Sequence, residues 1–108
     1  MSTAIAELSI EVKGARSPMK FAIHKPRWIK RMNAWGCRVT FSRPFEISTM
    51  IYGENSTQAL VLALKFASVS LYSSRLYKQK KLGLYGEYGR ELGIPALRTL
   101  LDIAPYPF

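Results

Sequence analysis

The spacing of apolar residues changes once along this chain, at Gly53–Asn55, from every second residue to every third or fourth. Before this point apolar and polar side chains alternate, which is the pattern of strands with one buried face. After it, apolar residues fall at positions 60, 63, 64, 67 and 71, the spacing of an amphipathic helix. Each such element must bury its apolar face against another. The change of period therefore predicts an α+β fold in which a sheet packs on one long helix.

The alternating region divides into four predicted strands, separated by Gly, Pro and a basic segment without a clear period at residues 25–34. Strands that follow one another with short links usually pair, so we expect a four-stranded antiparallel meander over residues 4–52, with one covered and one solvated face. The inward positions form the predicted sheet core: Leu8, Ile10, Val12, Phe21, Ile23, Val39, Phe41 and Ile47.

The helix is predicted to begin after Asn55, a good N-cap residue, with Gln58 placed to reach back as in a capping box. Its inward face is predicted to consist of Leu60, Ala63, Leu64, Ala67 and Leu71. The pattern allows a main helix over 56–81, about 39 Å long at 1.5 Å per residue. Because a domain of this size has a radius of gyration of only about 13 Å, we expect the helix to break near Ser73–Ser74 or to extend its basic end past the core.

The last part of the chain, residues 82–108, is rich in Gly and Tyr and is predicted to be an irregular tail. Pro95 at a first helical position, followed by leucines, predicts a short C-terminal helix that ends before Pro105. At 108 residues the whole chain is predicted to be a single domain, 1–108.

Side chains that carry catalytic chemistry are few. A single cysteine excludes a disulfide framework and a cysteine-based zinc site. The carboxylates show no metal-ligand spacing, so we predict neither a metal nor a cofactor. The only histidine, His24, is predicted to lie on the outward face of the second strand, near Lys20 and, across a plausible pairing, Arg38 or Thr40. A His–Arg–Thr group can in principle cleave RNA, but a solvent-facing strand histidine is more common, and we predict that the protein is not an enzyme.

The sequence shows no pattern of a secretory signal or of a membrane span. The first residues lack the basic and apolar segments of a secretory signal, and the longest apolar stretch, Ala59–Tyr72, is interrupted by Lys65 and two serines. That stretch falls short of the roughly 20 apolar residues of a membrane span. We therefore expect a cytoplasmic protein without a membrane partner, and the pattern specifies no oligomeric state.

The strongest functional signal is positive charge, with a formal net charge of +9. Nine basic residues and no acid lie between Glu11 and Glu46, and five more lie between Glu54 and Glu87, again with no acid. The segment from Lys25 to Arg31 also places Trp28 among cations, a combination that grips phosphates and stacks bases. Such a surface fits a nucleic-acid binder, and equally a binder of an acidic protein surface.

One motif resembles a known kind of protein. The stretch from Tyr52 to Leu64, YGENSTQALVLAL, and the later Leu92-Gly93-Ile94-Pro95 are similar to a family of small bacterial proteins of unknown function. In that family a Gly-x-Asp-Ser-x-Gln-Ala-Leu-x-Leu-Ala-Leu helix start follows a strand meander, and a Leu-Gly-Phe/Ile-Pro segment lies near the C-terminus. Asn55 replaces the usual Asp, a change that an N-cap tolerates. The resemblance implies an accessory or immunity-type partner rather than an enzyme, and supplies no catalytic residue.

Two functional hypotheses remain. The first is a protein-interaction module, most specifically an immunity protein that binds and neutralises a cognate toxin with an acidic contact face. The alternative is a basic nucleic-acid-binding protein. A rigid sheet presents anchor residues with less ordering cost than a glycine-rich tail, so we place the partner-binding patch on the sheet and its adjoining loop. The predicted partner-binding residues are Lys20, His24, Arg27, Trp28, Arg31, Arg38 and Tyr52.

Overall fold

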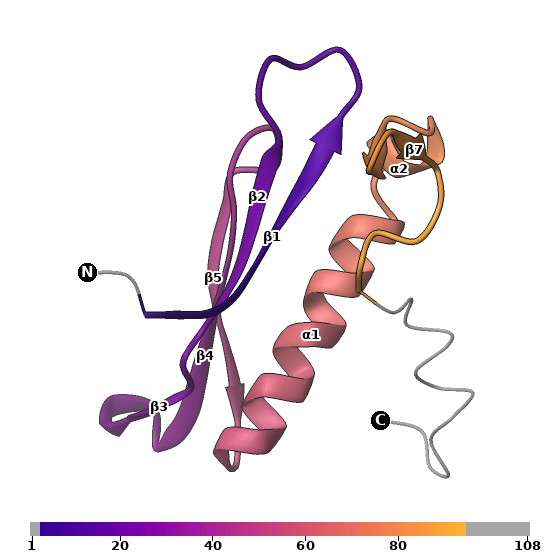
Figure 1. Cartoon of the computed structure of the whole chain (residues 1–108). Coiled ribbons are helices and arrows are strands. Elements are labelled where there is room, and N and C mark those ends of the chain that lie inside the picture. Colours follow the sequence, from indigo (N-terminus) through magenta and orange to yellow (C-terminus); the bar gives the residue numbers. More distant parts are fainter. Residues whose placement is uncertain (1–2, 95–108) are drawn as a thin grey trace, which may run out of the picture.

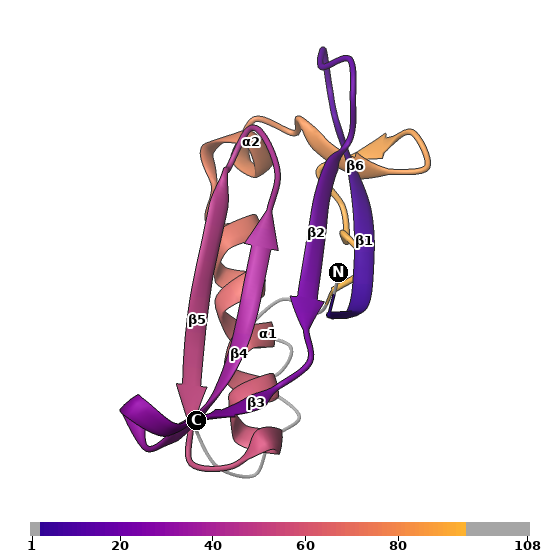
Figure 2. The same cartoon turned by 90° about the vertical axis from the view of Figure 1, so that its left-hand side faces the viewer.

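A computed structural model of the chain describes residues 3–94 and shows an α+β fold of two layers (Figure 1). One layer is an antiparallel sheet of seven strands, and the other is the main helix α1 (Ser56–Tyr72). Helix α1 lies against one face of this sheet. Figure 2 looks onto the opposite face, which no helix of the described residues covers. We call this uncovered side the outer face.

The predicted α+β class is confirmed, but the predicted number of strands is wrong. The four long strands are β1 (Ala4–Val12), β2 (Met19–His24), β4 (Ala34–Phe41) and β5 (Ile47–Gly53), and they pair antiparallel in that order. Three short strands join them: β3 (Arg27–Ile29), β6 (Leu82–Leu84) and β7 (Glu87–Tyr88). A strand of two or three residues is too short to show alternation, which is why the basic segment and the Gly/Tyr segment did not reveal them.

The core lies between the sheet and α1. Of the predicted sheet core, five residues are buried, namely Ile10, Phe21, Ile23, Val39 and Phe41, and the other three, Leu8, Val12 and Ile47, are partly buried against them. Three of the five predicted helix-face residues, Ala63, Ala67 and Leu71, are buried, and the face is centred slightly nearer to Ala59 than predicted. Ala59, Ala63, Ala67 and Leu71 are buried, whereas Leu60 and Leu64 are only partly buried. Apolar residues surround most of this helix, so their spacing alone does not fix which side faces the sheet.

The first turn of α1 is closed by two reciprocal side-chain contacts. The Asn55 Oδ1 accepts a hydrogen bond from the Gln58 N–H at 2.7 Å. The Gln58 Oε1 in turn accepts from the Glu54 N–H at 2.6 Å, one residue earlier than in a standard capping box. Both contacts satisfy backbone N–H groups at the end of β5 and the start of α1, so this segment fixes where the helix begins.

Replacing Asn55 by alanine is expected to lower the free energy of unfolding by about 1 kcal/mol, because the cap on the Gln58 N–H is lost. Urea denaturation of the purified protein measures this difference. The Asn55→Ser variant is the control, since serine also accepts at an N-cap, and it should stay close to the wild type. Equal losses in both variants would show that the cap is not the cause.

The main helix ends earlier than residue 81, at Ser73–Ser74, which is one of the two outcomes that its length allowed. The Ser74 hydroxyl donates to the Leu71 carbonyl at 2.7 Å and accepts from the Tyr77 N–H at 3.2 Å. One serine therefore satisfies the end of α1 and caps the short helix α2 (Arg75–Lys78). No helix within residues 3–94 is long and apolar enough to cross a membrane.

The segment after α2 is more ordered than the predicted irregular tail. Strands β6 and β7 form a hairpin that joins the sheet beside β1, and Leu92 and Ile94 are buried. The Tyr72 hydroxyl donates to the Ile94 carbonyl at 2.5 Å and accepts from the Leu92 N–H at 3.0 Å. Burial is the main cause that raises the pKa of Tyr72 above its ordinary value, which favours the protonated hydroxyl that donates here. The predicted helix after Pro95 lies outside the described residues.

Candidate binding site on the outer face of the sheet

The outer face is built from alternate residues of β2, β4 and β5. Arg38 pairs with Met50, Gly36 pairs with Tyr52, and Thr40 lies between Ala22 and Ser48. Paired residues on neighbouring strands point to the same side of a sheet. Since Cys37 and Val39 are buried on the side of α1, the residues that alternate with them lie on the outer face.

A break between β2 and β3 distinguishes one region of this face. Both strands pair with the same edge of β4, because β5 occupies the whole of its other edge. Three residues, 24–26, lie between the pairs Ile23–Val39 and Arg27–Gly36 on the segment from β2 to β3. On β4 only two residues, 37 and 38, lie between the same pairs. This is an irregularity of the β-bulge kind, and Pro26, which has no N–H to donate, lies within it. His24 lies on the outer face by alternation with the buried Ile23, and the extra residue returns Arg27 to the same face, so both lie near Arg38.

A pocket of about 290 Å³ opens at this break. It is lined by Thr3, His24, Lys25, Pro26, Arg27, Gly36, Arg38 and Met50. Three of these residues carry a positive charge, a fourth is histidine, and none is acidic. Pro26, Gly36 and Met50 add apolar surface. We call this site the bulge pocket.

Hydrogen bonds to neutral side chains orient two residues of the bulge pocket. The His24 ring lies between two threonines, with its Nδ1 3.0 Å from the Thr3 Oγ1 and its Nε2 3.3 Å from the Thr40 Oγ1. The Arg38 Nη1 donates to the Ser48 Oγ at 3.1 Å. Threonine and serine hydroxyls fix these side chains without neutralising positive charge.

Hydrogen bonds within the chain hold the backbone between β2 and β3 in place. From the core side, the Cys37 thiol donates to the His24 carbonyl at 3.3 Å, and burial raises the pKa of this thiol. From the edge, the Lys25 N–H donates to the Thr3 carbonyl at 2.9 Å. Glycine at position 36 leaves room for Met50, because a Cβ there would lie 2.7 Å from the Met50 Sδ. The shape of the bulge pocket is therefore set by contacts within the chain.

Among the described residues, no acidic side chain lines the bulge pocket or pairs with its cations. Across residues 3–94 the one ion pair is Arg43–Glu46, at 2.8 Å between two exposed side chains outside the pocket. Within the same range no group of three or more His, Cys, Asp or Glu residues is arranged to hold a metal ion. The arrangement is thus suited to bind an anionic group rather than a cation.

The structure brings together part of the predicted patch. His24, Arg27 and Arg38 line the bulge pocket, and Tyr52 lies on the same face opposite Gly36. Lys20 lines a separate hollow together with Glu7 on β1. Arg31 is exposed in the short 3₁₀ helix η1 (Lys30–Met32) that follows β3. Thr3 and Gly36 were not predicted, Lys25 was singled out only as part of the basic segment from Lys25 to Arg31, and the one sequence signal for the break was Pro26.

Trp28, which was expected in a loop beside the patch, lies in strand β3. Trp28 pairs with Trp35, and the two rings contact each other edge to face with centroids 6.2 Å apart. Trp35 packs against the core on the side of α1, so Trp28 lies on that side and not on the outer face. The cause is the alternation along β3, which places the neighbours Arg27 and Trp28 on opposite sides of the sheet.

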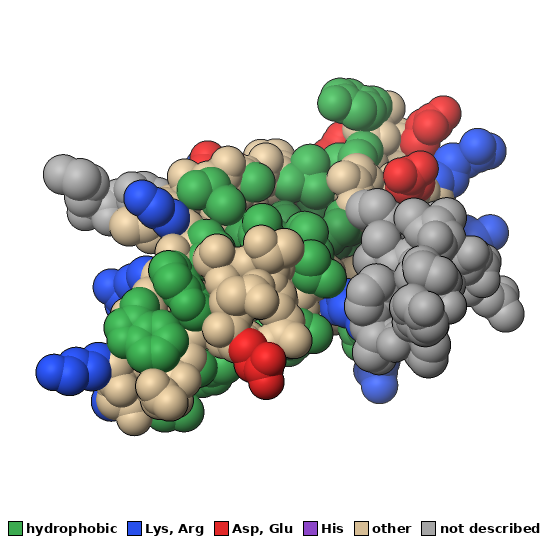
Figure 3. Space-filling model, turned by 90° about the horizontal axis from the view of Figure 1, so that it is seen from below, with side chains coloured by type: hydrophobic (Ala, Val, Ile, Leu, Met, Phe, Trp, Pro, Cys, Tyr) green, Lys and Arg blue, Asp and Glu red, His purple; other side chains and the backbone are tan. Residues whose placement is uncertain are grey.

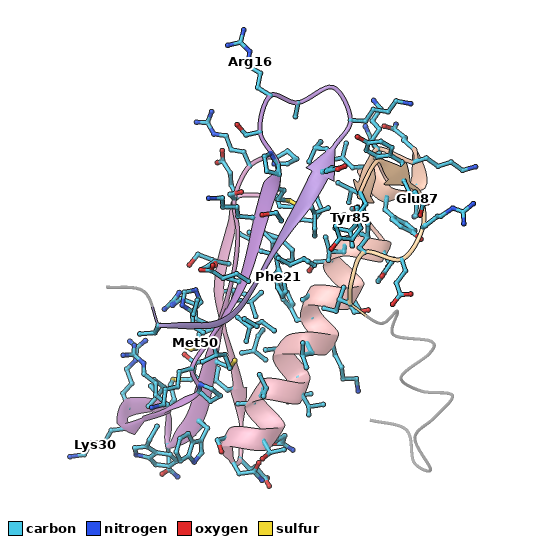
Figure 4. The ribbon with its side chains drawn as sticks, viewed as in Figure 1. Arg16, Phe21, Lys30, Met50, Tyr85 and Glu87 are labelled. Atoms are coloured by element: carbon cyan, nitrogen blue, oxygen red, sulfur yellow. The ribbon has the colours of Figure 1, made fainter. Side chains whose placement is uncertain are left out.

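Figures 3 and 4 show how charge is distributed around this region. Seen from the end of the molecule where β3 lies, Lys and Arg side chains project along the margin on the side of the outer face, next to hydrophobic side chains (Figure 3). Arg16 and Lys30 project from opposite ends of the sheet, and Met50 lies between them, nearer to Lys30 (Figure 4).

Residues 6–96 match the model of a family described as a domain of unknown function, DUF6968. The chain belongs to the DUF6968 family. The expectation of an uncharacterised family is thereby confirmed. Searches of curated proteins and of solved structures find no match. Apart from Thr3, every residue that lines the bulge pocket lies within the DUF6968 match.

Proposed function

We propose that this DUF6968 domain is a non-enzymatic binding module that takes an acidic protein partner on the outer face of its sheet. In its most specific form, the domain is a cytoplasmic immunity protein and the partner is a cognate toxin. One observation carries the proposal: the cations Lys25, Arg27 and Arg38 line a single pocket together with His24 on an uncovered sheet face, and no carboxylate lines this pocket. Unneutralised cations of this kind attract and orient an acidic surface.

The mixture of residues around the bulge pocket supports a protein partner. Arginine and aromatic or methionine side chains are enriched in the centres of protein interfaces, and here Arg27 and Arg38 adjoin Met50 and Tyr52. A stable interface needs about 800 Å² on each partner. Lys20, which lies further along β2, and Arg31, which is exposed in η1, would supply charge at the margin of such an area.

Catalysis has no support in the geometry of His24. Both of its ring nitrogens face threonine hydroxyls, and no carboxylate lines the pocket beside it. General acid–base chemistry usually relies on a partner that tunes the histidine. A protein that neutralises a toxin by occupying its surface needs no such group.

A second candidate function, nucleic-acid binding, is favoured by the surroundings of β3. Trp28 is 48% exposed on the α1 side of β3, and the exposed cations Lys30 and Arg31 follow it within three residues along the chain. An exposed aromatic ring beside cations suits base stacking and phosphate contact. This candidate requires the affinity for nucleic acid to fall with salt, with a log–log slope of about −0.9 per phosphate contacted on duplex DNA.

Co-expression with the product of the neighbouring gene tests the proposal. We expect a complex, and the Arg38→Glu variant should weaken it by at least about tenfold, which is 1.4 kcal/mol, because the reversed charge repels an acidic partner. Titration calorimetry at fixed ionic strength measures the affinity. Growth in the presence of the partner measures protection.

The matched control is Arg16→Glu, which makes the same change of charge in the exposed loop at the far end of the sheet (Figure 4). This variant should bind like the wild type. The proposal fails if the neighbouring product does not bind, or if folded Arg38→Glu binds and protects as well as the wild type. Tight binding of duplex DNA with the salt slope above would favour the second candidate instead.

A further inference from the structure

We infer that the bulge pocket receives one carboxylate on a short apolar stem, the chemistry of a glutamate or aspartate side chain. The inference rests on the proposed function only in assigning this carboxylate to a partner protein. Three features of the pocket itself indicate a carboxylate: its cations, the side chains that are held in place before a ligand binds, and its apolar surface.

The cations match the charge and shape of a carboxylate. Arg38 presents a planar guanidinium with five N–H donors, a fork that suits the two oxygens of a carboxylate. One of its nitrogens, Nη1, donates to the Ser48 Oγ. This bond holds the side chain, and other N–H groups are left to donate. Arg27 and Lys25 line the same pocket and add positive charge.

The contacts within the chain orient the site before a ligand arrives. Thr3 and Thr40 hold the His24 ring, and the Cys37 thiol holds the His24 carbonyl. Side chains that are already fixed lose less conformational freedom on binding. The His24 and Arg38 side chains are therefore held in place in the bulge pocket before a ligand binds.

The size and the apolar lining of the pocket favour an anion with an apolar stem. The volume of about 290 Å³ is many times the roughly 30 Å³ that one water molecule occupies. The pocket therefore has room for methylene groups beside an oxyanion. The surfaces of Pro26, Gly36 and Met50 offer contact to methylene groups next to the carboxylate. Inorganic phosphate has no such groups.

Titration of the ¹⁵N-labelled protein with acetate, propionate, butyrate and inorganic phosphate, at constant pH and ionic strength, tests the inference. We expect saturable shifts of the amide signals of residues 24–27 and 36–38, with Pro26 giving none. Affinity should rise by about two- to fourfold for each added CH₂, as partly or fully buried methylenes require. Phosphate should bind more weakly than butyrate.

Variants assign the binding to the pocket. Arg38→Gln should weaken butyrate binding by roughly tenfold, because a charged hydrogen-bond donor is lost, and Arg38→Lys should lose much of the affinity as well, because the fork is lost while the charge stays. Arg16→Gln is the matched control and should bind as the wild type does. If the Arg38 variants do not fold, the exposed Arg27→Gln variant should still show weakened binding.

Three results would overturn the inference: no saturable shift in these segments, unchanged binding by folded Arg38→Gln, or phosphate binding more tightly than butyrate. The titration uses no partner, so its failure leaves the co-expression result untouched. If butyrate binds as expected and the neighbouring product forms no complex, the subsite stands and the proposed function fails.

Discussion

Replacing Leu71 by alanine is expected to lower the free energy of unfolding by about 2–5 kcal/mol, the range for a fully buried leucine. Leu71 is fully buried in the last turn of α1, among the largest buried side chains of the described residues. Alanine would remove its buried methyl groups and leave a cavity that close-packed neighbours fill only in part. The Ser74 hydroxyl donates to the backbone carbonyl of residue 71, which alanine keeps, so the loss reports on the buried side chain. Urea denaturation followed by circular dichroism measures the loss.

The matched control lies on the same helix. Val69 is 44% exposed, so Val69→Ala should change the free energy of unfolding by no more than about 0.5 kcal/mol. If the two substitutions have similar effects, α1 does not face the sheet through Ala59, Ala63, Ala67 and Leu71.

The second large effect is expected at Gly53, the last residue of β5. A Cβ built there would lie 2.5 Å from the backbone nitrogen of Ala59 and 2.9 Å from its Cα. These are backbone atoms in the first turns of α1, and they cannot rotate aside as a side chain can. Gly53→Ala should therefore push β5 and α1 apart and destabilise the protein by about 1–3 kcal/mol or more.

Gly36→Ala is the control for this prediction, because its new Cβ would meet the side chains of Met50 and Ile29 instead of a backbone. These side chains can shift, so the loss at position 36 should be smaller. Thermal and urea unfolding of both variants provide the comparison. A larger loss for Gly36→Ala than for Gly53→Ala would mean that the contact between β5 and α1 is looser than described.

The sequence by itself determined the elements whose signals are local. Strands β1, β2, β4 and β5 alternate apolar and polar residues over lengths that show the period. The start of α1 is marked by Asn55 and Gln58, which lie within one turn of each other. The absence of acids from Lys13 to Phe45 is likewise visible in the sequence, and it led to Arg27 and Arg38 as candidate residues, while His24 was singled out as the only histidine. Each of these features depends on residues close together in the chain.

Only the tertiary structure decided which sides of the elements meet. Helix α1 is apolar on almost all sides, so its sequence pattern does not show which side faces the sheet. The side with the buried alanines faces it, where the helix backbone closely approaches Gly53. The pairing of Trp28 with Trp35 decided on which side of the sheet Trp28 lies. The bulge pocket forms because the segment from β2 to β3 has one residue more than the part of β4 opposite it. Residues distant in the chain make these contacts, and apolar spacing carries no information about which partner a side chain will meet.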